Sequence, residues 1–408
     1  MEQNIHRTGL FWASCVALIV TAMTFGIRAG ILGILGEEFS LSAAELGIVT
    51  GTAFWGFTLA MIFGGPLCDV LGMKKLILIA FVGHLIGIVL TIVANGFWSL
   101  FISTLVLGIS NGMVEAACNP LITSLYPNNK TEKLNMFHLW YPGGIVIGTL
   151  IGYFIQENEL GGWQIQMATM LIPTIIYGIL FFGKTFPVTE RVASGVTTAE
   201  MFRACMTPLF LFMIVCMFIT ASTEFGVNNW VPLFLQEGKV SSLLLLTWVT
   251  LIMALGRLLL GPIVHRSVAP EVALLFSAVF SAIGIYWLSY ATGYTAFAAA
   301  AVFGLGVSFF WPTMLGFVSE YLPKTGALGL ALMGGAGMLC VAFALPVLGG
   351  IYDEKVAEAT AAGASTVVGG SETLRTIIVL PIFLIVAFAG LVFYMRNRKK
   401  ETLVTSNH

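Results

Sequence analysis

The chain has 408 residues, of which 58% are hydrophobic and only 10% are charged, and its formal net charge at pH 7 is -1. This composition, with a mean hydropathy of +0.95, lies far outside the average for soluble globular domains and indicates a membrane protein. The balanced charge, and the lack of a long basic block outside the tail at 396–400, argue against a nucleic-acid partner.

Twelve apolar segments are long enough to cross a bilayer, since about 30 Å of hydrocarbon needs roughly 20 helical residues. The first segment is too long for the apolar region of a signal peptide and is expected to stay as a span. The sequence therefore predicts an all-α membrane protein with twelve transmembrane helices. The expected spans lie near 9–35, 44–67, 75–94, 97–125, 135–155, 164–183, 207–235, 241–264, 272–290, 294–321, 326–351 and 374–395.

The first span carries a single charge, Arg28, in its outer half by residue count. A guanidinium group holds a carboxylate through two parallel hydrogen bonds, so Arg28 is the best hint that the substrate is charged. Glycines also recur at four-residue spacing, as in Gly26 and Gly30 or Gly144 and Gly148. This spacing permits close helix contact, and we expect these glycines to line moving interfaces.

The loop GPLCDVLGMKK from Gly65 joins the second and third spans. Asp69 is able to cap and pair with neighbouring helices, while Lys74 and Lys75 reach acidic partners or lipid phosphate. We expect these residues to form a cytoplasmic gate that opens during transport. Arg257, near the inner end of the eighth span, is assigned to the same layer.

The segment GISNGMVEAACNPLITSLYP, residues 108–127, is compatible with lipid except for Glu115. Asn111 and Asn119 stand four residues to either side, so a helix places all three in one stripe about 80° wide. An ionisable group at the centre of a span costs on the order of 2.5–3.5 kcal/mol and usually marks a transport pathway. Because burial favours the protonated form of a carboxyl group, Glu115 is expected to couple proton movement to transport. The alternative is a static hydrogen bond between helices.

The seventh span repeats this arrangement with Glu224 and Asn228, followed by Trp230. Each half thus offers one acid, and Glu115 and Glu224 are both expected to carry protons. Because the first and seventh spans are equivalent, Arg28 and Glu224 are expected to face each other, where an ion pair closes the outer side. A static buried pair is the alternative.

Other candidates for substrate contact are aromatic or imidazole side chains beside polar or proline positions. Tyr141, Trp230 and Trp311 offer faces on which the C–H surface of a carbohydrate stacks, although packing or interfacial anchoring explains such residues equally well. His138, one turn before a proline, is either a relay or sugar ligand or a structural histidine.

The longest polar interruption, residues 184–204, divides the chain into two halves of six spans. Sequence near Gly65 recurs near Gly261, and LGIS at 107 recurs as LGVS at 305. Such internal repeats are typical of secondary transporters. We predict an N-terminal bundle at 1–183, a central loop at 184–204, and a C-terminal bundle with a basic tail at 205–408.

Lysine and arginine positions predict the orientation, because cytoplasmic loops keep positive charge. Fourteen of the nineteen basic residues fall in loops on the side of the two termini, and two lie within spans. Only Lys239, Lys355 and Arg375 fall on the opposite side. Both termini are therefore expected to be cytoplasmic, in a bacterial inner membrane.

GPLCDVLGMKK resembles the cytoplasmic loop motif of the major facilitator superfamily in its glycines, aspartate and paired basic residues. More narrowly, SNGMVEAACNP and LNMFHLWYPGGIVIG resemble the fucose-permease group of sugar:proton symporters, and the second half does so more loosely through GRLLLG, FFWPT and MGGAGM. The resemblance implies inward transport of a neutral sugar with a proton. One departure is Arg28, since the first span in that group carries acidic or amide groups.

These patterns predict a proton-coupled importer of a monosaccharide or sugar acid, with neutral hexose, hexuronate and sialic acid all open. The alternatives are an exporter of drugs or metabolites, which tends to use a broad apolar cavity, and an organic-anion symporter of the same superfamily. No catalytic constellation or metal cluster stands out, so we expect no enzyme activity, cofactor or metal. We expect a monomer surrounded by lipid, with its six cysteines as core thiols.

Overall fold

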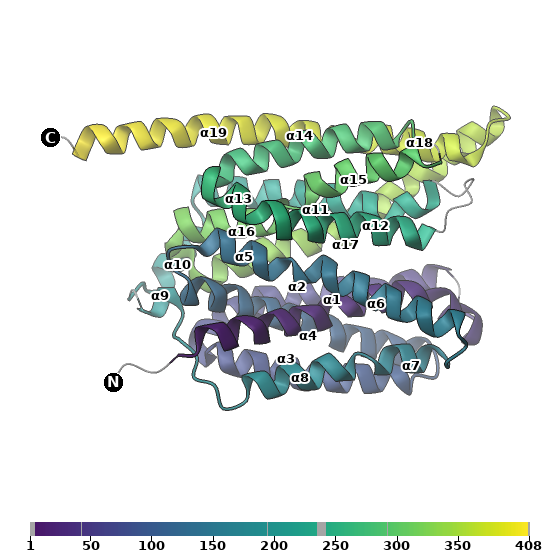
Figure 1. The fold of residues 1–408 in the computed structure, drawn as a ribbon, viewed down its shortest axis with the longest axis horizontal. Helices are drawn as coiled ribbons and strands as arrows, with labels where there is room; N and C mark the ends of the chain where they lie inside the picture. Colours follow the sequence, from purple (N-terminus) through teal and green to yellow (C-terminus); the bar gives the residue numbers. More distant parts are fainter. Residues whose placement is uncertain (1–4, 42, 194, 235–241, 292, 407–408) are drawn as a thin grey trace.

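The structure, a computed structural model, describes residues 5–41, 43–193, 195–234, 242–291 and 293–406. The regular secondary structure of these residues is all helical, with no strand among them (Figure 1). The helices before the central loop are α1 (Arg7–Glu38), α2 (Ala43–Leu71), α3 (Met73–Ile92), α4 (Phe97–Leu125), α5 (Lys130–His138), α6 (Trp140–Glu157), α7 (Trp163–Ala168) and α8 (Leu171–Phe181). Two short helices, α9 (Glu190–Ala193) and α10 (Thr198–Cys205), lie in the central loop or at its end.

The second half is built in the same way. Its elements are α11 (Pro208–Phe234), α12 (Ser242–Leu255), the π-helix η1 (Gly256–Leu260), α13 (Gly261–Ser267), α14 (Pro270–Leu288), α15 (Thr295–Val307), α16 (Phe310–Tyr321), the 3₁₀ turn η2 (Pro323–Thr325), α17 (Gly326–Ala361), α18 (Thr366–Ile377) and α19 (Val379–Ser406).

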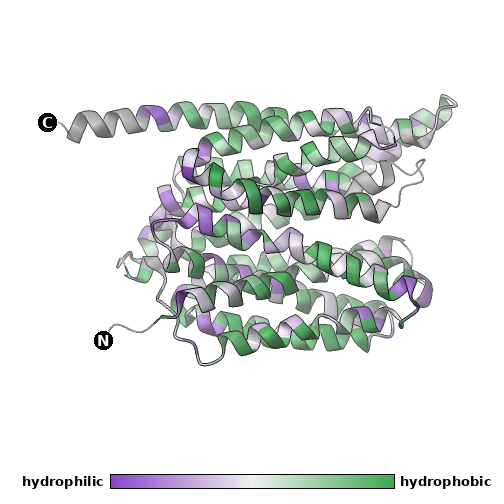
Figure 2. Ribbon diagram, viewed as in Figure 1, coloured by the Kyte–Doolittle hydropathy of each residue, from purple (hydrophilic) through white to green (hydrophobic). Residues whose placement is uncertain are grey.

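Twelve of the described helical segments are long and apolar enough to cross a membrane. Their bounds agree with the expected spans to within a few residues for most of the chain, which confirms the predicted fold class. Apolar residues dominate the middle of the helices, and hydrophilic ones gather toward their ends (Figure 2). Both termini lie at the same end of the helices, which we call the termini face (Figure 1).

Five spans are interrupted, and each interruption has a proline as its cause. The breaks are α5/α6, α7/α8, α12/η1/α13, α15/α16 and α18/α19. A proline lacks the N–H that would bond to the carbonyl oxygen four residues earlier, and its ring crowds that carbonyl. In every broken span, the residue four positions before a proline lies at or beside the break. These prolines are Pro142, Pro173, Pro262, Pro312 and Pro381.

Glycines allow close helix contact inside the first half. Helix α1 packs on α6, and α2 packs on α4. A Cβ atom at Gly144 of α6 would lie 2.7 Å from the Cβ of Ala22 and 2.9 Å from the carbonyl oxygen of Ile19, both in α1. The predicted close contact is therefore present, but these glycines lie within one half rather than at the boundary between the halves.

At the termini face, α5 of the first half packs against α16 of the second. The Lys130 ammonium donates a hydrogen bond to the carbonyl oxygen of Ser319 at 3.2 Å. The Thr131 backbone N–H donates to the Glu320 carboxylate at 3.1 Å, and the Thr131 hydroxyl donates to the same oxygen. These contacts join the two halves on this side of the molecule.

Farther from the termini face, the N-terminal and C-terminal bundles contact each other along their sides. Thr149 of α6 and Thr247 of α12 approach to 3.5 Å through their hydroxyl groups. The rings of Trp55 in α2 and Phe343 in α17 make an edge contact with centroids 5.6 Å apart. Between these sides a cavity remains.

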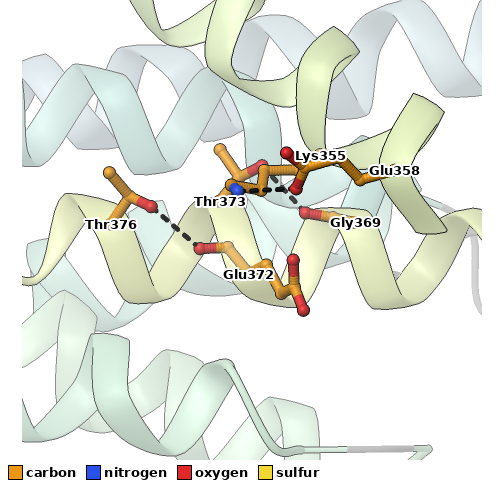
Figure 3. Close-up of polar contacts among 6 residues, drawn as sticks. All are labelled: Lys355, Glu358, Gly369, Glu372, Thr373 and Thr376. Atoms are coloured by element: carbon orange, nitrogen blue, oxygen red, sulfur yellow. Dashed lines mark hydrogen bonds and ion pairs between the residues drawn. The ribbon is translucent and has the colours of Figure 1, made fainter.

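Helix α17 continues to Ala361, beyond the expected end of its span at 351. In this extension Lys355 forms an ion pair with Glu358 at 2.7 Å (Figure 3). The neighbouring α18 begins before the expected twelfth span, and its Thr373 and Thr376 hydroxyls donate to carbonyl oxygens one turn earlier (Figure 3). The polar ends explain why hydropathy alone set these boundaries too short.

Candidate functional site

A cavity of about 210 Å³ lies in the half of the molecule away from the termini face. It is smaller than the roughly 300–1,000 Å³ typical of sites for drug-sized ligands, so it suits a single ring or a small acid. We call it the outer cavity. Helices α1, α2, α6, α11 and α12 line it through Phe25, Gly26, Arg28, Ala29, Leu32, Thr50, Phe54, Tyr141, Pro142, Ile145, Glu224, Phe225, Asn228, Leu246, Thr250 and Met253.

The outer cavity presents one cation, one anion and several hydrogen-bonding atoms without partners. Arg28 and Glu224 are its charged residues. The Tyr141 hydroxyl, the Thr50 hydroxyl and the Asn228 amide oxygen are buried, and no group in the described part of the chain bonds to them. Buried polar atoms normally find a partner, so these three are positioned to bind a polar ligand.

A second group of polar side chains, which we call the central cluster, forms the floor of the outer cavity. The two share Tyr141, Glu224 and Phe225. The free volume inside the cluster is only about 10 Å³, too little for a substrate. The cluster is made of Glu115, His138, Tyr141, Glu224, Phe225, Arg257, Trp311 and Met338.

Arg257 lies in the central cluster, so its assignment to the cytoplasmic layer was wrong. It is 3% exposed and interacts electrostatically with Glu224 and Glu115. Its Nε donates to the carbonyl oxygen of Ser308 at 2.6 Å, and its Nη1 donates to the carbonyl oxygen of His138 in the first half. Arg257 is also within η1, and π-helical segments occur frequently at functional sites.

Glu115 belongs to a chain of hydrogen bonds within the central cluster. The Asn119 amide nitrogen donates to the Glu115 carboxylate at 3.4 Å, and the Asn119 amide oxygen lies 3.0 Å from His138 Nε2. Since that oxygen only accepts, His138 carries a proton on Nε2. The Trp311 indole lies near Glu115, and its N–H has no acceptor within hydrogen-bond distance. The central cluster and Asn119 thus bring together six of the predicted site residues, namely Glu115, Asn119, His138, Tyr141, Glu224 and Trp311.

Arg28 and Glu224 share the outer cavity but do not form the expected ion pair. In the described part of the chain no hydrogen bond or ion pair reaches the Arg28 guanidinium, which is 8% exposed. Glu224 also lines the central cluster together with Arg257, and among the described residues these two form no ion pair either. Among the described residues, Arg28 therefore has no countercharge.

Asn111 lies outside both cavities, although it shares the predicted stripe with Glu115. Its amide nitrogen donates to Thr24 at 2.8 Å, and its amide oxygen accepts from His84 Nε2 at 2.9 Å. His84 Nδ1 in turn lies 2.9 Å from the Tyr177 hydroxyl. Four helices, α1, α3, α4 and α8, are joined by this fully satisfied network.

The predicted gate residues contact the central loop. Asp69 accepts a hydrogen bond from the Thr189 hydroxyl at 2.5 Å, and Lys74 donates to the carbonyl oxygen of Lys184 at 3.1 Å. Lys75 is exposed. The side chain of Trp230 lies outside the described residues, so its predicted contact with substrate stays a prediction.

Sequence reasoning missed several residues of the outer cavity. Thr50, Phe25 and Phe54 carry no signal in the sequence, because a threonine or phenylalanine in an apolar span is ordinary. Arg257 did carry one, since an arginine inside a span is rare and usually faces a pathway.

The profile of the family described as "Major Facilitator Superfamily" matches residues 14–345. Among curated proteins, the cis,cis-muconate transport protein of Acinetobacter baylyi is 24% identical over 67% of this chain and 69% of its own length. The D-xylose transporter of Levilactobacillus brevis is also 24% identical, but that alignment covers only 39% of this chain and 34% of the relative.

Solved structures share the fold at low sequence identity. A variant of the E. coli fucose:proton symporter aligns with a TM-score of 0.70 at 15% identity, covering 92% of this chain and 98% of that one. The human organic anion transporter MFSD10 aligns with a TM-score of 0.72 at 12% identity, covering 94% and 99%. At these identities the likeness is one of fold.

Proposed function

Because this chain belongs to the Major Facilitator Superfamily, we propose that it is a proton-coupled secondary transporter that imports a monosaccharide or sugar acid by alternating access. Its family and fold are those of membrane transporters rather than enzymes. The proposal requires a proton gradient as the energy source and no cofactor.

The observation that carries the proposal is a pair of buried carboxyl groups, one from each half, that line the same small cluster as one guanidinium, that of Arg257. Glu115 is 1% exposed, Glu224 is 5% exposed, and Arg257 interacts with both. One carboxylate is balanced by Arg257, while the other has no second cation in the cluster. A buried charge without a partner is costly, so this second carboxyl group is the one that gains and loses a proton.

The outer cavity supports a polyhydroxylated substrate. Tyr141, Thr50 and Asn228 offer free hydrogen-bonding atoms, and Phe25, Phe54 and Tyr141 form a group of rings with centroids 5.6 and 6.1 Å apart. Rings and a few placed polar groups are the usual components of a specific small-molecule site. Relatives named as transporters of D-xylose and myo-inositol agree with this class.

The position of the outer cavity supports import. The lysine and arginine distribution predicts that the termini face is cytoplasmic. The two halves are in contact at that face through Thr131 and Glu320, and the outer cavity lies away from it, which supports entry of substrate from outside. We propose that the protein alternates between this state, which is closed at the termini face, and a state that is open there. We further propose that it works as a monomer in a bacterial inner membrane.

Symport of a non-carbohydrate organic anion is a second candidate. The unpaired Arg28 favours it, together with relatives named as a muconate transport protein and a gentisate transporter. Both candidates use the same proton-coupling cluster and differ in the chemistry of the ligand in the outer cavity.

Transport by purified protein in proteoliposomes tests the proposal. We expect labelled sugars or sugar acids to accumulate when the outside is acidic, and Glu115→Gln to abolish that accumulation while exchange of preloaded substrate continues. A glutamine keeps the shape and cannot carry the proton, so only the coupling is lost.

Glu224→Gln is the companion variant, because only one of the two acids needs to titrate. Comparison of the two variants identifies the coupling group. If both variants still concentrate substrate against its gradient, the carboxyl groups play no part in coupling and the proposal is wrong.

A further inference from the structure

We infer that Arg28 forms a carboxylate-binding subsite in the outer cavity, and that the substrate is a monocarboxylate carried with one proton in an electroneutral step. The inference rests on the proposed function, since it assigns the substrate class of the same site. Three observations carry it: the unpaired guanidinium, the charges of the pathway, and the free polar atoms beside Arg28.

Arg28 is a buried cation without a protein partner in the described part of the chain. A guanidinium is always charged, so it cannot escape the cost of burial by losing a proton. Its planar fork matches a carboxylate through two parallel hydrogen bonds. A carboxylate in the outer cavity would thus supply the countercharge that the protein leaves out.

The empty pathway is balanced overall. Arg28 and Arg257 contribute two positive charges, and ionised Glu115 and Glu224 contribute two negative ones. His138 and Tyr141, the other titratable groups that face the cluster, are neutral in this count. An empty, unprotonated carrier therefore moves no net charge when it changes conformation.

A monoanionic substrate and one proton preserve this balance when they bind together. The carboxylate neutralises Arg28, and the proton neutralises the carboxyl group that Arg257 does not balance. Binding of either one alone leaves a net charge in a region of low dielectric, which opposes the conformational change. A neutral sugar with a proton would leave one positive charge. The arrangement thus favours symport of an acid over symport of its neutral analogue.

The free polar atoms beside Arg28 suit the rest of a sugar acid. The Asn228 amide oxygen accepts hydrogen bonds from hydroxyl groups, while the Tyr141 and Thr50 hydroxyls both donate and accept. All three line the same cavity as Arg28. A substrate that lacked hydroxyl groups would leave these buried atoms unpaired.

The decisive experiment compares acids with matched neutral sugars in proteoliposomes of the full-length protein. The pairs are D-glucuronate with D-glucose, D-galacturonate with D-galactose, and N-acetylneuraminate with N-acetylmannosamine, and cis,cis-muconate serves as a hydroxyl-free acid. The pH gradient and the membrane potential are imposed separately. We expect at least one acid to be taken up at ten times the rate of its neutral partner or more, driven by the pH gradient, with less than a twofold response to the potential.

The possible outcomes separate the inference from the proposed function. Uptake of a neutral sugar, driven by the membrane potential and equal to or faster than its acid, overturns the Arg28 subsite and leaves proton-coupled sugar import standing. Uptake of muconate, which is a dicarboxylate, without any sugar acid overturns the monocarboxylate inference and also rejects the carbohydrate substrate. If none of the seven compounds is transported, both are rejected.

Arg28 variants provide the test at the residue. We expect Arg28→Gln to lower uptake of the acid about 100-fold, because truncating one side of a buried charged pair is strongly unfavourable. Arg28→Lys should retain electroneutral uptake at a reduced rate, since it keeps the charge and loses the planar fork. Arg375→Gln is the matched control: this arginine is exposed and stacks on Tyr290, outside the cavity.

The comparison of acids with neutral sugars uses the wild-type protein, so it tests the inference even if an Arg28 variant does not fold. Thermal unfolding of each variant in detergent shows whether a loss of transport is a loss of structure. Arg28→Gln that folds and still takes up the acid at the wild-type rate overturns the subsite.

Discussion

The two carbonyl oxygens that Arg257 holds have the same origin. His138 stands four residues before Pro142 and Ser308 four residues before Pro312, and neither proline has an N–H to offer. Each carbonyl is therefore left open by its own helix, one in each half of the molecule, and the guanidinium of Arg257 fills both. A single side chain thus connects the two halves and the two acids.

Pro142→Ala tests this connection, because alanine restores an N–H that bonds to the His138 carbonyl within the helix. Arg257 then loses its hydrogen-bond acceptor in the first half and moves toward the carboxyl groups of Glu115 and Glu224. A cation beside a carboxyl group favours the ionised form, so it opposes proton uptake. A hydrogen bond to a charged group is worth about 1.5–3 kcal/mol, so we expect at least a tenfold lower initial rate of proton-driven uptake. Pro381→Ala, at the break between α18 and α19, should leave the rate unchanged. Equal rates in both variants would remove the His138 carbonyl from the mechanism.

The sequence predicted the acids of the site better than their partners. Glu115 and Glu224 stood out because a carboxyl group inside a span is rare, and the structure places both in the central cluster. The stripe through Asn111 was also a sound helical pattern, but it does not say which neighbour each residue meets. Asn111 turns to His84 and Thr24, and Arg257 reaches the cluster instead of the termini face. The partners of Asn111 and the position of Arg257 both depend on how the helices pack against one another. The sequence of a single helix does not give that packing.

At the scale of the elements, the spans were predictable because the thickness of the bilayer fixes their apolar length. The breaks can also be explained from the sequence, since a proline lies about four residues after each one. However, Pro66 and Pro120 lie within the continuous helices α2 and α4. A proline in a span thus marks a possible break, and packing decides whether the helix is interrupted.

Gly144→Val tests the close contact of α6 with α1. The new side chain would meet the Ala22 Cβ at 2.7 Å and the Ile19 backbone at 2.9 Å, and backbone atoms cannot rotate away. Overpacking of this kind costs roughly 1–3 kcal/mol, so we expect a clearly lower unfolding temperature in detergent. Gly390→Val in α19, where nothing lies within 4 Å, is the matched control and should unfold like the wild type. A stable Gly144→Val protein would mean that the two helices are not in tight contact.

At the scale of the whole molecule, alternating access requires that the contacts at the termini face break while the outer cavity closes. The closing contacts differ in strength. The Glu320 carboxylate accepts two hydrogen bonds from Thr131, whereas Glu132 forms a single ion pair at 3.5 Å with Arg266, whose side chain is 72% exposed. Both glutamates bridge the halves, but exposed ion pairs of the second kind contribute little.

Removing the two glutamates one at a time measures how closure at the termini face is maintained. Spin labels at Asn129→Cys and Lys324→Cys, both exposed and on opposite halves, report the distance across this face. We expect Glu320→Ala to increase the population of the longer distance about tenfold, since losing its two bonds, discounted for partial exposure, costs about 1–2 kcal/mol. Glu132→Ala should change the distribution less than twofold, because its ion pair is single, 3.5 Å long and made with an arginine that solvent surrounds. The same shift in both variants would mean that net charge at this face, and not the Thr131 contact, controls closure.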